Sequence, residues 1–361
     1  MKPSMLFPFF GLMLAVQAVQ AAEHGGPTEP PVTHFQGTCD SDPDGRKFAE
    51  RACYTDYNPG KARKGRYYKP PTCDKSQPVD EQQRTMLAKV YSRAPDYMKS
   101  KLCRLTQIFV TRANDWGPWG WGFWEGADRP PGKGVYVAIS GHELATKQSI
   151  AEAENETVDR LVSRHGRTER SLLRLRSPDP ADPELTVLGE LAHELGHALL
   201  ADSNGDGVDE AHPRRRISGP PQSACFEDAF IKASWDPDRF HRHMRRWSEF
   251  GAQYGNEPRN REVSLSRLRA AVRKGRIRAA NDVISAVYDS REFAGPAAIP
   301  NPIEEVAETY KLKVLTDVAA SSPITFQLKG KDLNLSDLLK SDVLSKKVEC
   351  LRALGFLADQ R

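Results

Sequence analysis

The chain has 361 residues, of which 39% are hydrophobic and 28% are charged. That length can bury a sizeable core and predicts one large or two modest folded domains. The 52 basic and 48 acidic residues leave a net charge of only +4, so the composition does not indicate a nucleic-acid partner or a membrane surface.

Residues 1–21 are expected to form a secretory signal peptide. Lys2 precedes an apolar run over residues 5–16, and Val-Gln-Ala at 19–21 suits signal peptidase. The run is too short to span a membrane, and no later segment is long and apolar enough to span one. The residue directly after the expected cut is not a cysteine, so nothing indicates a lipid anchor. We therefore expect a secreted or periplasmic protein without a membrane anchor.

Residues 22–38 are rich in Gly, Pro and polar side chains and predict a flexible leader. Residues 39–78 form a turn-rich, basic and cysteine-rich segment, either a pro-region or, as we favour, an N-terminal extension packed on the main domain. In an exported protein an even number of cysteines predicts disulfides. We expect the first four to staple the N-terminal region and the last two to pair with each other: Cys39, Cys53, Cys73, Cys103, Cys225 and Cys350.

The main domain is expected to span residues 79–361. Its first elements are a helix at 82–101 that Pro95 divides, strands at 105–112 and 135–140, and a helix at 147–165. The loop between the strands carries Trp116, Trp119, Trp121 and Trp124. These rings either form substrate subsites beside a strand that pairs with an extended peptide, or cover the sheet, which is the simpler interpretation.

A long helix is expected after Asp182 and Pro183, because aspartate is a favoured N-cap and proline fits the first helical turn. It carries His193, Glu194 and His197 in an H-E-x-x-H motif. Residues four apart lie on the same helix face, so the two imidazoles can bind one metal ion, with Glu194 beside it and placed to hold a water molecule. The motif therefore predicts a catalytic metal site rather than two ordinary core histidines.

This helix is expected to end near Asp202, where a second metal site is conceivable. Oxygen side chains alternate at Asp202, Asn204 and Asp206, and Gly207 supplies the turn that a calcium loop needs. The acidic residue expected at loop position 12 is absent, since Pro213 stands there. The segment is therefore either a calcium site or a solvated acidic turn.

The rest of the chain is expected to be mainly helical, apart from a break at 294–302 that is rich in Ala and Pro. The predicted helices lie at 223–250, 262–289, 303–314 and 343–357. The helix at 303–314 is the strongest of them, with Pro302 at its entrance.

Two histidines do not complete a catalytic zinc site, which normally takes three protein ligands and a water molecule. A metzincin would have Gly and His soon after the motif, but position 200 is Leu and position 203 is Ser. The chain instead resembles the gluzincin proteases, which include thermolysin and the anthrax lethal factor-like peptidases. Their ligand helix often reads E-[DE]-[FV]-A-E-x-[FY], and residues 304–310 of this chain read EEVAETY.

This resemblance implies that Glu304 is the third zinc ligand. Glu308, one turn further along, would then hydrogen-bond a ligand histidine and fix its orientation, and Glu305 would point away. Glu227 is an alternative third ligand, because it lies in a similar acidic segment closer to the motif, but it lacks a second acidic residue four positions later.

The expected fold is α+β: a zincin-like metalloprotease domain with a small mixed sheet, an active-site helix and a helical C-terminal part. The expected function is that of an exported zinc-dependent metallopeptidase, in which Glu194 activates a zinc-bound water to hydrolyse a protein or peptide substrate. Tyr288 or His212 would donate a hydrogen bond to the transition state. The alternatives are a catalytically degenerate zincin scaffold that acts as a secreted binding protein, and a toxin-like protease with one narrow target.

Overall fold

The computed structural model describes residues 41–55, 73–74, 76–105, 107–111, 121–123, 136–162, 172–178, 180–202, 223–240 and 258–357. The expected signal peptide, the leader, His212 and the tryptophans at 116, 119 and 124 lie outside these residues, and so does the candidate calcium loop beyond Asp202. Within them the protein combines helices with two small sheets, as the expected α+β class requires.

The larger sheet has four strands in the order β1-β2-β4-β3. Strands β1 (Ala52–Thr55), β2 (Gln107–Thr111) and β4 (Tyr136–Ser140) are parallel, and β3 (Trp121–Phe123) pairs with β4 in the antiparallel direction at the edge. Every residue of β4 is buried, as expected for a parallel strand that is covered on both faces. The two strands predicted from the sequence are confirmed as β2 and β4, whereas β1 and β3 are too short to be recognised by their periodicity.

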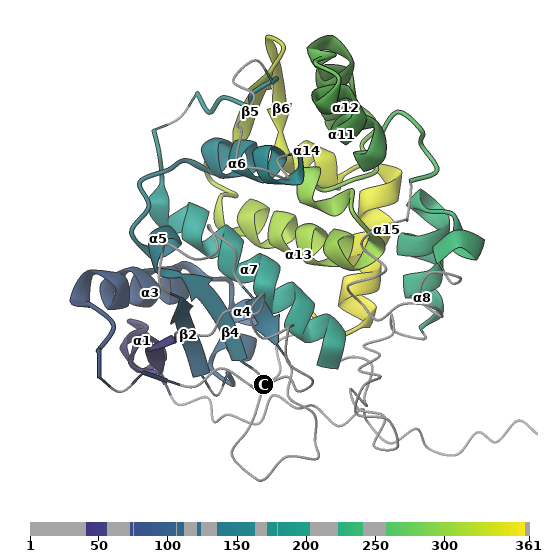
Figure 1. Cartoon of the computed structure of the whole chain (residues 1–361). Coiled ribbons are helices and arrows are strands. Elements are labelled where there is room, and N and C mark those ends of the chain that lie inside the picture. The colour runs from purple at the N-terminus through teal and green to yellow at the C-terminus, as the bar shows by residue number, and fades with distance from the viewer. Residues whose placement is uncertain are drawn as a thin grey trace, which may run out of the picture. The chain divides into compact units, whose positions relative to one another are not determined.

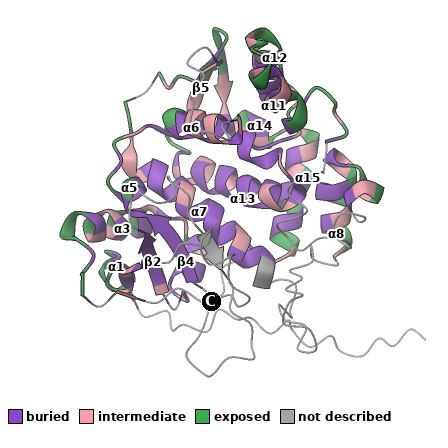
Figure 2. Ribbon diagram, in the orientation of Figure 1, coloured by how far each residue is buried: buried purple, intermediate pink, exposed green. Residues whose placement is uncertain are grey.

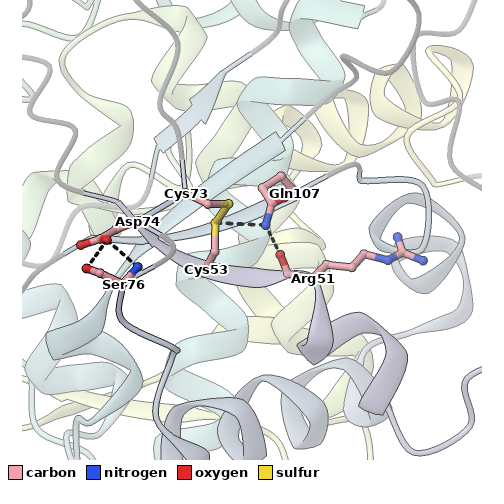
Figure 3. Close-up of a disulfide and its surroundings, with 6 residues drawn as sticks. All are labelled: Arg51, Cys53, Cys73, Asp74, Ser76 and Gln107. Carbon is pink, nitrogen blue, oxygen red and sulfur yellow. Dashed lines mark hydrogen bonds between the residues drawn. A yellow bond between two sulfur atoms is a disulfide. The ribbon is translucent and has the colours of Figure 1, made fainter.

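The cysteine-rich segment contributes directly to this sheet. It supplies helix α1 (Arg46–Glu50) and strand β1, and a disulfide joins Cys53 of β1 to Cys73 (Figure 3). The side-chain amide of Gln107 in β2 donates to the carbonyl of Arg51 and approaches the Cys53 sulfur at 3.2 Å. Residues 41–55 are therefore part of the main fold.

The helices follow the predicted segments closely in the first half of the chain and with more breaks in the second half. Pro95 divides the first predicted helix, as expected, and Gly275, with a φ of 63°, lies where the helix predicted at 262–289 divides. The helices are α3 (Glu81–Arg93), α4 (Asp96–Leu102), α5 (Gly141–Leu144), α6 (Ile150–Val162), α7 (Pro183–Asp202), α8 (Ala224–Phe226), the π-helix η1 (Glu227–Lys232), α11 (Leu265–Arg273), α12 (Ile277–Asp289), the 3₁₀ turn η2 (Pro296–Ala298), α13 (Pro302–Val318), α14 (Leu335–Leu339) and α15 (Asp342–Ala353).

Helices α7 and α13 cross at the centre of the described part, and both are largely buried (Figures 1 and 2). Helix α7 also packs against α3, α6 and the strands β3 and β4. It begins as predicted: the Asp182 carboxylate accepts the backbone N–H of Leu185 at 3.0 Å, and Pro183 is the first helical residue. The predicted apolar stripe lies in the core at Leu188, Leu191, Leu195, Ala198 and Leu199.

The C-terminal part adds a hairpin and a second disulfide. Strands β5 (Thr325–Leu328) and β6 (Lys331–Asn334) form the hairpin, which the sequence analysis did not identify. The predicted pairing of Cys225 with Cys350 is confirmed and ties α8 to α15. No helix among the described residues has the length and apolar character that crossing a membrane requires.

Candidate metal centre

Helix α7 presents His193, Glu194 and His197 from its buried middle. His193 and Glu194 are almost completely shielded from solvent, and His197 is partly exposed. The helix is held in place on several sides by its packing against α13, α3, α6 and the sheet. The H-E-x-x-H residues therefore project from a rigid element.

Glu304 reaches the same point from the first turn of α13. The Asn301 side-chain oxygen accepts the backbone N–H groups of Ile303 at 2.8 Å and Glu304 at 3.0 Å, so it caps the helix. Pro302 occupies the first helical position, where its missing N–H costs no hydrogen bond. This local sequence fixes where α13 begins and so directs the Glu304 carboxylate towards α7.

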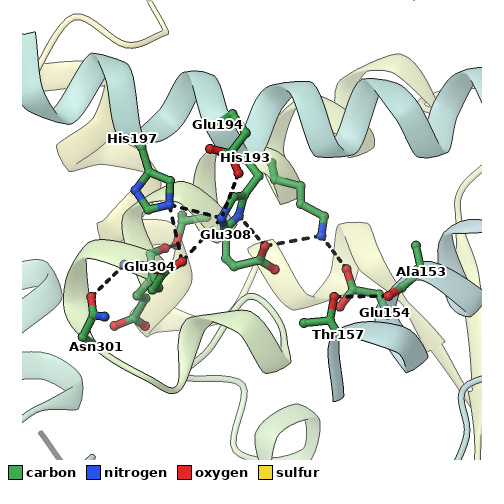
Figure 4. Close-up of polar contacts among 12 residues, drawn as sticks. Ala153, Glu154, Thr157, His193, Glu194, His197, Asn301, Glu304 and Glu308 are labelled. Atoms are coloured by element: carbon green, nitrogen blue, oxygen red, sulfur yellow. Dashed lines mark hydrogen bonds and ion pairs between the residues drawn. The ribbon is translucent and has the colours of Figure 1, made fainter. Parts of the chain in front are cut away.

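The three side chains converge on one point (Figure 4). The Nε2 atoms of His193 and His197 are 3.2 Å apart, and Oε2 of Glu304 is 3.4 Å from each of them. Two ligands bound at about 2.0–2.1 Å to a tetrahedral ion are separated by roughly 3.3 Å. The three atoms therefore occupy three corners of a site that could hold one metal ion. The motif predicted the two imidazoles at this site, and the resemblance implied Glu304.

The Glu304 carboxylate and the two imidazoles shift one another's pKa values towards their charged forms. Burial by itself raises the pKa of Glu304, but the imidazoles of His197 and His193 outweigh it and hold that pKa well below its usual range. Burial lowers the pKa of His193 and His197, and the neighbouring carboxylates reverse the effect, so both imidazoles have a raised pKa. This group of side chains thus favours an ionised carboxylate and strongly favours positive charge beside it, whether from a proton or from a metal ion.

Glu194 lies beside this group. Its Oε1 atom is 3.9 Å from Nε2 of His193. Burial raises the pKa of Glu194 to about 7, with the two imidazoles acting in the opposite direction. A carboxyl group with a pKa close to neutrality can both accept and release a proton near physiological pH.

Glu308 lies one turn beyond Glu304 and contacts the far side of the His193 ring. Its Oε1 atom accepts the Nδ1–H of His193 at 2.7 Å. Although burial raises the pKa of Glu308, Lys311 and His193 lower it to about 2, so the group is an ionised acceptor. This contact selects the tautomer of His193 that leaves Nε2 free to bind a metal, which is the orienting contact expected from the sequence.

Three other residues considered in the sequence analysis lie elsewhere. Glu305 points away from the metal group, into a fully buried ion pair with Lys347. Glu227 begins the π-helix η1 and does not belong to the group of converging ligand atoms. Tyr288 is buried beside a small interior cavity that Glu308 also lines, and its hydroxyl has no hydrogen-bond partner among the described residues. Because this hydroxyl is buried, we do not assign it contact with a substrate.

Two buried lysines next to the site were missed by the sequence analysis. Lys311 contacts Glu308 and Glu154, and Lys347 contacts Glu305 and Ser234. The spacing of Lys311 three residues after Glu308 places both on one helix face, which is a usable signal. The partners on other elements leave no comparable trace in the sequence.

Comparisons with known proteins do not extend these observations: no family model, curated protein or solved structure matches this chain. The candidate metal centre is therefore defined by the contacts within the chain itself. Its elements are three converging ligand atoms, a buried carboxyl group beside them and a carboxylate that orients one of the imidazoles.

Proposed function

We propose that this chain is a zinc-dependent metallopeptidase of the gluzincin type. His193, His197 and Glu304 would bind the zinc ion, and Glu194 would act as the general base. One observation carries the proposal: three ligand atoms 3.2–3.4 Å apart lie next to a buried carboxyl group whose pKa is near neutral. An ordinary buried ion-pair network has no need of that fourth group.

The donor set favours zinc over other metals. Two imidazole nitrogens and one carboxylate oxygen are typical of catalytic zinc, whereas calcium and magnesium prefer sites built from oxygen atoms alone. Three protein ligands also leave a fourth tetrahedral position for water or substrate, which a structural site with four protein ligands does not. The Glu308 contact to His193 supplies the outer hydrogen bond that zinc-binding histidines usually make.

In the proposed reaction, zinc when bound polarises the scissile carbonyl and makes the attacking water more acidic. Glu194 holds that water, accepts its proton as the new C–O bond forms, and returns the proton to the leaving nitrogen as the C–N bond breaks. Glu308 keeps the His193 ring in one orientation throughout. The burial of Glu194 raises its affinity for the proton, which suits a group that must first accept and then donate.

The surroundings of the site fit a peptide substrate. Strand β3 is the last strand of the sheet and packs against α7, so an extended peptide paired with it would run past the candidate centre. The Cys53–Cys73 and Cys225–Cys350 disulfides are typical of an oxidising compartment, in keeping with a secreted or periplasmic enzyme.

The test is peptide hydrolysis by the zinc-loaded protein and its Glu194→Gln variant. We expect the variant to retain one zinc ion and to lose activity by at least about a hundredfold, because the base is gone. Glu184→Gln, on the partly exposed first turn of the same helix, is the matched control and should stay active. Because a protease with one narrow target would leave casein intact, a diverse peptide library is the appropriate substrate.

Equal activity in wild type and Glu194→Gln would contradict the proposed mechanism. Zinc binding without hydrolysis of any library peptide by the wild type would instead favour the alternative, a zincin scaffold that acts as a secreted binding protein.

A further inference from the structure

A chain of polar contacts continues from the metal centre into the protein interior (Figure 4). Oε1 of Glu308, which accepts the Nδ1–H of His193 at 2.7 Å, also faces Nζ of Lys311 at 3.3 Å. The same ammonium donates to Oε1 of Glu154 at 2.6 Å. This series of contacts therefore links α7, α13 and α6. A single oxygen, Oε1 of Glu308, contacts both the His193 imidazole and the Lys311 ammonium.

The three interior members of this chain are buried: Glu154, Glu308 and Lys311 are 5%, 2% and 6% exposed. Taking an ammonium and two carboxylates out of water is costly, and their mutual attraction repays the cost only when the contacts are well formed. A displaced Lys311 would leave the two buried carboxylates without the ammonium that both contact. The side chains are thus strongly held in this one arrangement.

The backbone at Gly295 lies close to the same two carboxylates. A Cβ at Gly295 would lie 2.9 Å from Oε2 of Glu308 and 3.4 Å from Oε2 of Glu154. The adjoining cavity measures about 10 Å³, no more than the space of one water molecule. The Gly295 backbone therefore lies against both carboxylates, and a side chain at this position would displace Glu308.

We propose that Lys311 is a positioning residue for the metal centre and that Glu154 is its anchor. Lys311 touches none of the candidate ligands and acts through Glu308. It holds Oε1 of Glu308 on the His193 Nδ1–H and thereby keeps Nε2 of His193 directed at the point shared with His197 and Glu304. This role rests on the proposed metal centre.

A merely structural ion pair would behave differently from a positioning residue. Loss of a structural pair lowers the unfolding temperature but leaves the metal affinity of the folded protein unchanged. Loss of a positioning residue weakens metal binding in protein that is still folded, because outer contacts to ligand histidines typically change metal affinity by about 10–100-fold.

The experiment titrates zinc into the metal-free full chain in competition with a chromophoric chelator and compares wild type, Lys311→Met and Lys313→Met. Lys313 lies on the same helix and pairs with Asp317 in a partly exposed position, so it is a matched control. We expect Lys311→Met to raise the zinc Kd by about tenfold or more and Lys313→Met to leave it unchanged. The cobalt-loaded Lys311→Met protein should also show an altered visible absorption spectrum.

Glu154→Gln provides a second, milder variant if Lys311→Met does not fold. It keeps an oxygen for Lys311 but removes the charge that anchors the ammonium, so we expect a smaller increase in the zinc Kd, about threefold. A folded Lys311→Met or Glu154→Gln protein with the wild-type Kd and cobalt spectrum would overturn the positioning role alone. Failure of the wild type to bind zinc would overturn the metal centre itself.

Discussion

Gly196 of α7 and Ala307 of α13 are in backbone contact where the two site helices cross. A Cβ at Gly196 would lie only 2.8 Å from Cα of Ala307. Because that Cα belongs to the backbone, it cannot turn away as a flexible side chain could. The His193 and His197 imidazoles lie within 3.4 Å of Glu304 because the helices that carry them approach this closely.

Gly196→Ala should therefore push the helices apart. Helix propensity alone would favour alanine over glycine by about 1 kcal/mol. We nevertheless expect a net loss of roughly 1–3 kcal/mol in unfolding free energy, and overpacking is the cause of that loss. Zinc affinity should fall as well. Gly189→Ala on the same helix is the control, because its Cβ would meet flexible side chains at ordinary contact distances: Leu315 at 3.4 Å and Cε of Lys311 at 3.7 Å. Urea unfolding of wild type and both variants is the measurement. A Gly196→Ala protein as stable as wild type would contradict the expected clash.

Lys347→Met tests the second buried ion pair. Lys347 is fully buried, donates to Ser234 Oγ at 2.7 Å and to the carbonyl of Glu292 at 2.5 Å, and pairs with Glu305. Removing the ammonium leaves Glu305 as an uncompensated buried charge, which should cost about 3–5 kcal/mol. Lys340→Met, which removes an exposed pair with Asp337, should have little effect in the same chemical denaturation experiment. A small loss in Lys347→Met would mean that Glu305 is protonated in the fold.

The start of each site helix could be predicted from the sequence because the signals are local. Asp182 and Pro183 mark the beginning of α7, and Asn301 and Pro302 mark that of α13. How the two helices meet depends on tertiary packing. Glu227 and Glu304 are both plausible ligands by spacing, and only the crossing at Gly196 brings Glu304 to the histidines.

The interior charges were missed for the same physical reason. Lys311 and its partner Glu154 are 157 residues apart, so no periodicity or motif connects them. The β5–β6 hairpin was missed although Lys329 and Gly330 both adopt positive φ angles, because a Lys-Gly turn is a weaker signal than Asn-Gly or Asp-Gly. Local signals and recognisable motifs were thus accessible from the sequence, whereas the pairing of buried charges on distant elements was not.

Glu143 should make stability depend on pH. Burial, together with Glu190, raises the pKa of Glu143 from 4.5 to about 8. Between these values the unfolded chain releases this proton while the folded chain keeps it, so Glu143 lowers the unfolding free energy as pH rises from 4.5 to about 8. Glu143→Gln removes this effect. Its stability relative to wild type should increase between pH 5 and pH 8 in urea unfolding, and a constant difference would contradict the assignment.

The pH profile of hydrolysis should report Glu194. The pKa of Glu194 is raised to about 7 by burial, and the ionised form is the one that accepts a proton. A bound metal ion adds positive charge and lowers this pKa, so kcat/KM should fall on acidification with an apparent pKa at or below about 7. Metal content measured over the same pH range separates this titration from loss of zinc. An acid limb well above 7 with zinc still bound would exclude Glu194 as the titrating group.

The central claim is that His193, His197 and Glu304 form one metal site, and metal content tests it most directly. We would load three purified proteins with zinc: wild type, Glu304→Ala and Glu227→Ala. After removal of excess metal, inductively coupled plasma mass spectrometry gives the zinc content of each protein. We predict one zinc ion per chain in the wild type and in Glu227→Ala, and none in Glu304→Ala. Zinc that is retained in Glu304→Ala but lost in Glu227→Ala, or a folded wild type that binds no zinc, would contradict the account.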